Sequence, residues 1–112
     1  GRDDRSNRSR LPLQTLLQQT DPNKPILLLD HQPFHLNETE KAGVDFQFSG
    51  HTHHGQIWPI TLVTDHLFEQ SYGYRQWGDS HIYVSSGLSL WGPPFRIGTD
   101  SEFVIIQITC KK

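Results

Sequence analysis

Two short apolar runs in this chain each lead into a histidine, and this repeated arrangement limits the folds that the chain can adopt. The first run, residues 26–29, lies between two prolines and is followed by Asp30 and His31. A short apolar run between such breakers predicts a buried strand. The second run, residues 44–49, alternates apolar and polar side chains as a strand does, and it leads into His51.

The stretch between the two runs predicts a short helix. Asn37 is a suitable N-cap, acidic residues follow it in the first turn, and Gly43 is a suitable stop. Strand, helix and strand form a βαβ unit, in which the two strands run parallel and their carboxyl ends meet at one edge of the sheet. Binding and catalytic groups of open α/β sheets gather at that edge, where we expect His31 and His51 to lie.

His53 follows His51 at a spacing that suits metal binding. In extended backbone two such side chains point the same way, roughly 6.5 Å apart. They can then serve a metal pair about 3.5–4 Å apart, one nitrogen for each ion. With seven histidines in 112 residues, a close pair also arises by chance, and a histidine-rich polar turn is the alternative.

The remaining segments predict a scaffold of the α/β class. Residues 11–19 and 60–70 predict short helices, and residues 73–85 predict a β-hairpin. Asp79, Ser80 and His81 have the Asp-x-His spacing of a metal motif, but they fall in that hairpin. Residues 103–108 are rich in β-branched side chains and predict a final strand.

Composition limits the classes of function. A net charge of −2 gives no indication of nucleic-acid binding. The single cysteine, Cys110, excludes an internal disulfide, and no stretch approaches the roughly 20 apolar residues of a membrane span. A hydrophobic content of 34 % is low for a self-sufficient globule. We therefore expect residues 1–112 to form one part of a larger domain, with some of that domain's buried surface exposed.

Three segments together resemble the calcineurin-like metallophosphoesterases, and most closely the bacterial membrane-associated branch of that superfamily. They are Ile-Leu-Leu-Leu-Asp-His-Gln-Pro-Phe (26–34), Ser-Gly-His-Thr-His-His-Gly-Gln-Ile-Trp-Pro (49–59) and Val-Ser-Ser-Gly-Leu-Ser-Leu-Trp-Gly-Pro-Pro-Phe-Arg-Ile-Gly (84–98). Gly50-His51-Thr52-His53 resembles the last motif of the family, Gly-His-x-His. The resemblance implies the C-terminal half of a four-layer αββα sandwich, here the βαβ unit, the hairpin and the final strand.

The resemblance also implies roles for individual residues. His31 and His51 match ligands of the second metal, and His53 matches a ligand of the first. Asp30 is a candidate to orient an imidazole from behind, although consecutive strand residues face opposite ways and it can equally do nothing there. His54 and Arg96 are candidate substrate contacts. A solvent-facing side chain for the former and a structural ion pair for the latter are the alternatives.

The family's Asp-x-His, Gly-Asp-x-x-Asp and Gly-Asn-His motifs are absent in suitable context, so the chain supplies no catalytic residue. The resemblance implies that two divalent ions (Mn, Fe or Zn) hydrolyse a phosphomonoester, phosphodiester or pyrophosphate bond, in some members of a lipid-linked substrate. That activity would need the missing N-terminal half, and the whole protein would be associated with a bacterial membrane. A non-catalytic metal-binding module and an assembly module that pairs through an exposed strand edge are the alternatives.

Overall fold

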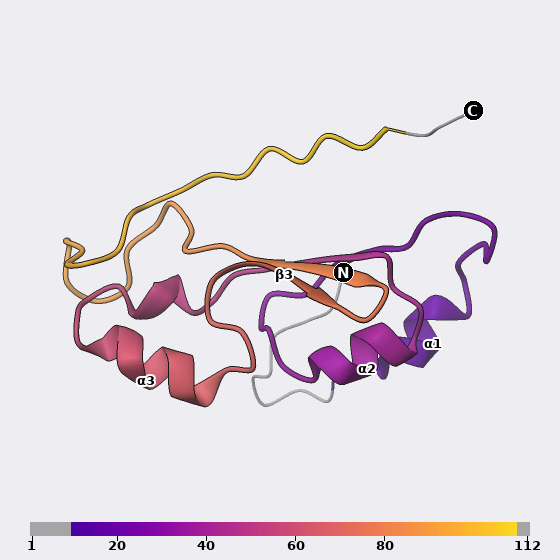
Figure 1. The fold of residues 1–112 in the computed structure, drawn as a ribbon, viewed down its shortest axis with the longest axis horizontal. Coiled ribbons are helices and arrows are strands. Elements are labelled where there is room, and N and C mark those ends of the chain that lie inside the picture. Colours follow the sequence, from indigo (N-terminus) through magenta and orange to yellow (C-terminus); the bar gives the residue numbers. More distant parts are fainter. Residues whose placement is uncertain (1–9, 110–112) are drawn as a thin grey trace.

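The computed structural model describes residues 10–109, so Cys110 lies outside the described part of the chain. Four strands form one sheet in the order β1-β2-β4-β3 (Figure 1). They are β1 (Leu27–Leu29), β2 (Phe46–Ser49), β3 (Gly73–Trp77) and β4 (Ser80–Val84). β1, β2 and β4 are mutually parallel, and β3 pairs antiparallel with β4. The predicted βαβ unit, hairpin and α/β class are therefore confirmed.

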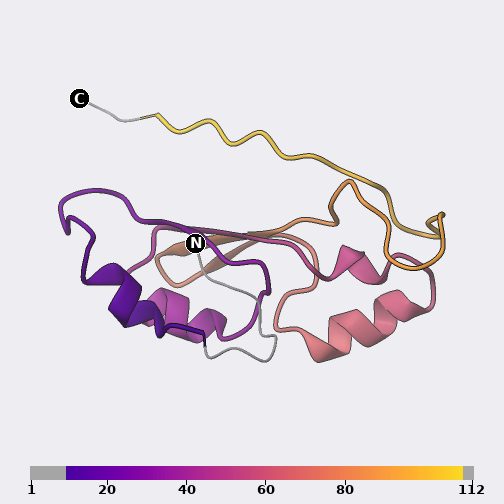
Figure 2. The same ribbon diagram turned by 180° about the vertical axis from the view of Figure 1, so that it is seen from behind.

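Three α-helices and one 3₁₀ turn complete the fold. They are α1 (Leu13–Leu17), α2 (Leu36–Lys41), η1 (His53–Gly55) and α3 (Ile60–Leu67). Figures 1 and 2 show all three α-helices on one side of the sheet. No described helix is long and apolar enough to cross a membrane.

Two buried apolar clusters join α1 and α2 to the sheet. Leu13 of α1 packs with Leu28 of β1 and with Val44 in one cluster. Leu36 of α2 packs with Ile82 and Val84 of β4 in the other. The alternation of side chains along a strand explains why only every second strand residue reaches this core.

α2 begins two residues earlier than the sequence predicts. Its N-cap is His35, in the left-handed region at φ 59°, and Asn37 lies inside the helix. The Oε1 atom of Glu69, far along the chain, accepts a hydrogen bond from the backbone nitrogen of His35 at 3.2 Å. This long-range contact helps to fix the helix start, whereas the predicted stop at Gly43 is confirmed by its φ of 71°.

The opposite face of the sheet is open within residues 10–109, which corrects the prediction of a buried first strand. Leu27 and Leu29 of β1 are 49 % and 61 % exposed. In register they lie beside Phe46 and Phe48 of β2, and Phe48 stacks on Tyr83 of β4. We call these five residues the open sheet face.

The predicted final strand is wrong. Residues 101–109 are extended but have no strand partner, and they run along the side of the sheet away from the helices (Figures 1 and 2). Phe103 is 73 % and Ile105 is 83 % exposed. A strand requires hydrogen bonds from a neighbour, and no edge of the described sheet lies beside this segment.

Candidate metal centre

The carboxyl ends of the parallel strands bring three distant segments together. The backbone nitrogen of Gly50 donates to the carbonyl of His31 at 3.0 Å, and that of Ser85 donates to the carbonyl of Ser49 at 2.8 Å. The strand ends of β1, β2 and β4 are thus tied into one edge. Parallel pairing places the first histidine there, as the sequence predicts.

His31 and His51 face each other across this edge. The Nδ1 atom of His51 lies 3.1 Å from the Nε2 atom of His31, and the two rings meet edge to face at 5.0 Å between centroids. Two imidazole nitrogens that bind one ion at about 2.1 Å and at right angles are about 3 Å apart. The separation therefore fits two ligands of a single ion.

The second nitrogen of His51 has its own partner. Its Nε2 atom lies 3.3 Å from the Nε2 atom of Gln32, a buried amide. Such a contact holds the orientation of the imidazole ring. Gln32 is a positioning residue that no spacing in the sequence marks, because its partner is 19 residues away.

His53 lies on the same cavities as the other two histidines. Its Nδ1 atom is buried and has no hydrogen-bond partner. Burial lowers the pKa of His53 below its usual value, and the positive charge of Arg96 lowers it further. Metal binding requires the neutral imidazole, so this environment favours the form that can act as a ligand.

The three histidines fit the nitrogen ligands of a metal site. Across residues 10–109, no group of three or more histidine, cysteine, aspartate or glutamate side chains is arranged to enclose an ion. The three imidazoles suit borderline transition metals, but no carboxylate joins them.

The backbone that carries the histidines is strained. β2 ends at Ser49, and His51, His53, His54 and Gln56 all have positive φ, between 49° and 69°. The prediction of extended backbone through the His-x-His pair is therefore wrong: the two side chains reach one cavity through a turn. Left-handed backbone costs about 1 kcal/mol or more per non-glycine residue, and such residues cluster at functional sites.

Asp30 pairs with Arg10. The Nη2 atom of Arg10 lies 2.6 Å and 2.5 Å from the two carboxylate oxygens of Asp30, and the carboxylate is almost fully buried. The backbone nitrogen of Gln32 donates to the same carboxylate at 3.4 Å. The aspartate thus anchors the residue that follows His31, through the backbone.

The candidate substrate contacts lie in structural positions. His54 stacks on Tyr72 with 4.5 Å between ring centroids and lines neither of the two cavities at the histidines. Arg96 donates to the backbone carbonyls of His53, Ser86, Gly87 and Ser89 at 2.8–3.1 Å. Its guanidinium therefore clamps the loop after β4 onto the histidine turn, and no ion pair of Arg96 is present in the described structure.

Comparison with known proteins shows several relatives of this chain by sequence. The chain is 37 % identical over 97 residues to a metallophosphoesterase of Helicobacter pylori strain J99, covering 85 % of this chain and 26 % of the relative. It is 36 % identical over 91 residues to a metallophosphoesterase of Campylobacter jejuni, covering 80 % of this chain and 24 % of the relative. A bovine protein named as a transmembrane protein with a metallophosphoesterase domain is 34 % identical over 95 residues, which is 82 % of this chain and 21 % of the relative.

The chain spans about a quarter of the length of these curated relatives. It matches no protein-family model. No solved structure matches it significantly.

Proposed function

Because this chain belongs to the calcineurin-like metallophosphoesterase superfamily, we propose that it supplies three imidazole ligands to a dinuclear centre that hydrolyses phosphate esters. His31 and His51 hold one ion, and His53 holds the other. The observation that carries the proposal is the 3.1 Å approach of the His31 and His51 nitrogens at the edge of a parallel sheet.

Two divalent ions, when bound, lower the pKa of a bound water and stabilise the charge on the phosphoryl oxygens. Neutral imidazole ligands favour Mn, Fe or Zn over the harder Mg and Ca. Gln32 holds the ring of His51, and Arg96 holds the backbone of His53. These contacts keep the ligand nitrogens in place before an ion arrives, which reduces the reorganisation that binding requires.

The carboxylate ligands and the general acid come from outside this sequence. The chain has none of the Asp-x-His, Gly-Asp-x-x-Asp or Gly-Asn-His motifs in suitable context. We therefore expect the chain alone to show no appreciable phosphoesterase activity. In the four-layer αββα sandwich that we propose for the whole domain, the N-terminal half covers the open sheet face.

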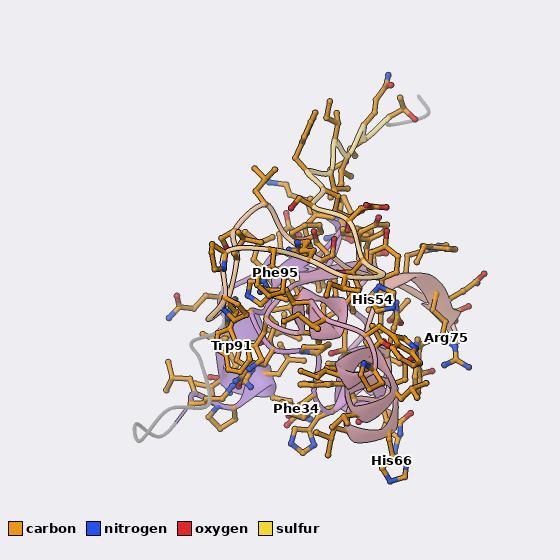
Figure 3. All side chains as sticks on the ribbon, turned by 90° about the vertical axis from the view of Figure 1, so that its left-hand side faces the viewer. Phe34, His54, His66, Arg75, Trp91 and Phe95 are labelled. Carbon is orange, nitrogen blue, oxygen red and sulfur yellow. The ribbon has the colours of Figure 1, made fainter. Side chains whose placement is uncertain are left out.

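Metal content tests the proposal directly. Mass spectrometry on the purified chain, supplied with Mn²⁺ or Zn²⁺, should find metal retained by the wild type and lost by the His51→Ala/His53→Ala double variant. The matched control is His54→Ala/His66→Ala, because neither of those histidines lines the cavities at the site. Figure 3 shows the ring of His66 directed away from the body of the molecule. Metal loss in the control as well would contradict the assignment of ligands.

An assembly module is the second candidate, and the exposed leucines of the edge strand β1 favour it. In that case the chain would bind no metal. Metal binding therefore separates the two candidates, because the exposed edge favours association in both. A third class, a metal-binding module without chemistry, would hold one ion per chain and gain no activity when the carboxylate-bearing half is added.

A further inference from the structure

One face of α3 is apolar but does not pack into either buried cluster. Ile60, Val63, Thr64 and Leu67 have the i, i+3, i+4, i+7 spacing of a single helix face. Of these, Ile60, Val63 and Leu67 are 40 %, 52 % and 64 % exposed. An apolar stripe at this spacing normally faces a core, so its exposure here calls for an occupant.

The stripe forms one wall of a cavity of about 560 Å³. Phe68 and Trp91 continue the apolar lining, and His31, His51 and His53 also line the cavity. Figure 3 looks onto this end of the molecule and shows Trp91 and His66 well separated, on different sides. The volume suits a small organic group.

Trp91 is held in place by a buried glutamine. The Nε2 atom of Gln56 donates to the carbonyls of Trp91, Pro93 and Phe95 at 2.7, 3.0 and 3.1 Å. Its Oε1 atom accepts from the backbone nitrogen of Trp91 at 2.5 Å. The backbone that carries Trp91 is therefore fixed by the fold, and a pre-positioned backbone lowers the entropic cost of binding a ligand.

A second cavity of about 250 Å³ meets the same three histidines from another direction. Ser49, Ser85, Ser86 and Ser89 line it together with the histidines. The imidazoles thus border two cavities, a small one that presents four serine residues beside Phe48 and a larger one with a mainly apolar wall. A ligand with a charged head and an apolar body matches this division.

We propose that the apolar cavity receives the organic group of the phosphate ester, so that the substrate class is a phosphate ester with an alkyl or aryl group. This inference rests on the proposed phosphoesterase function, which places the phosphoryl group at the histidines. The stripe on α3 and the ring of Trp91 then recognise the group beyond the phosphorus by apolar burial.

Alkyl phosphates of increasing length test the inference on the chain itself. An NMR titration compares methyl, butyl and hexyl phosphate, each with and without Zn²⁺. A fully buried methylene raises affinity about fourfold, and in this open cavity we expect about twofold per methylene. The length dependence should disappear in Leu67→Asn. It should persist in Leu62→Asn, which is the same substitution on the same helix at matched exposure (63 % against 64 %) but outside the cavity.

Each outcome bears on one of the two proposals. Equal affinity at all chain lengths, or a length dependence that Leu67→Asn leaves intact, overturns the apolar-group inference. A cavity filled by a second copy of the chain would give no length dependence and a dimer sensitive to Leu67→Asn, which also overturns it. The metal proposal is read separately, because its failure removes the effect of Zn²⁺ and leaves the length dependence in place.

Discussion

At the scale of single residues, Glu102 joins the extended C-terminal segment to the sheet. Its Oε2 atom accepts hydrogen bonds from the hydroxyls of Tyr72 and Tyr83 at 3.2 and 3.1 Å. Its Oε1 atom accepts from the backbone nitrogen of Ser86 at 3.0 Å. One carboxylate therefore holds together β4, the segment before β3 and the extended segment.

The pKa of Tyr83 reports on this contact. Burial first, and then the hydrogen bond to Glu102 and its negative charge, raise this pKa from 10.0 to about 12. Because the folded pKa lies above the unfolded one, the stabilisation is complete below pH 10.0 and is lost as the pH rises toward about 12. In Glu102→Gln we expect the pKa of Tyr83 to fall, measured by the ultraviolet absorbance of the phenolate.

The Tyr83→Phe variant assigns that titration, because the part of the high-pH phase that belongs to Tyr83 should be lost in it while that of Tyr72 remains. A phenolate titration of Tyr83 unchanged by Glu102→Gln would mean that burial alone sets the pKa. It would also mean that the Glu102 carboxylate does not hold the extended segment against Tyr83.

Gln56 is the residue on which the loop around Trp91 depends most. It is 1 % exposed, and Gln56→Ala would leave three backbone carbonyls without their donor. We expect the free energy of unfolding to fall by about 3 kcal/mol, measured by urea denaturation. Gln76→Ala is the control, since Gln76 is exposed and donates to a single carbonyl. A loss no larger than that of the control would contradict the role of Gln56.

At the scale of elements, Gly55 sets how closely η1 approaches α3. A Cβ atom at Gly55 would lie 2.6 Å from the Cα atom of Thr61 and 2.8 Å from the carbonyl carbon of Ile60. Both are backbone atoms, so the helix itself would have to move. The φ of 69° adds the cost of left-handed backbone.

Two glycine variants separate these effects. Gly43 has a similar φ of 71°, but a Cβ there meets nothing within 4 Å. We expect Gly43→Ala to lose about 1 kcal/mol of unfolding free energy from φ alone, and Gly55→Ala to lose about 3 kcal/mol or more. Chemical denaturation monitored by circular dichroism measures both. Similar losses would show that the approach of the helix is not tight.

Elements with a local signal were predictable from the sequence. β1, α2 and β2 follow from two apolar runs and a glycine stop, because each signal is contained within the element. Residues 103–108 carry an equally clear strand pattern, yet pairing depends on a neighbour that composition cannot supply. The start at His35 was missed for the same reason, since Glu69 contributes from a distant segment.

At the scale of the whole molecule, the position of the candidate site was predictable from the sequence. The contacts that hold its side chains and loops in place were not. The two parallel strands of a βαβ unit end at the same edge of the sheet, so His31 and His51 lie together there whatever surrounds them. The positions of the two histidines in the sequence were therefore sufficient to predict that they meet. The contacts of Gln32 with His51, of Gln56 with Trp91 and of Arg96 with His53 join residues 19, 35 and 43 positions apart. Only the complete chain path brings such partners together.

The open sheet face gives the whole molecule a tendency to associate. Leu27 and Leu29 expose apolar surface on β1, whose outer edge has no strand partner in the described sheet. Exposed edges and apolar faces favour pairing with a second chain. We expect the wild type to associate with rising concentration in sedimentation velocity experiments, and Leu29→Lys to weaken that association.

Because Leu29 is exposed, the effect of Leu29→Lys on association can be measured without a large change in the free energy of unfolding. Leu29 is 61 % exposed, so the lysine should change the free energy of unfolding by no more than about 0.5 kcal/mol. Leu62→Lys is the matched control, because Leu62 is 63 % exposed but lies on α3, which packs on the side of the sheet away from the open face. A control that weakens association as strongly would place the contact on the helices instead. A wild type that stays monomeric at every concentration would contradict the prediction that the open sheet face drives association.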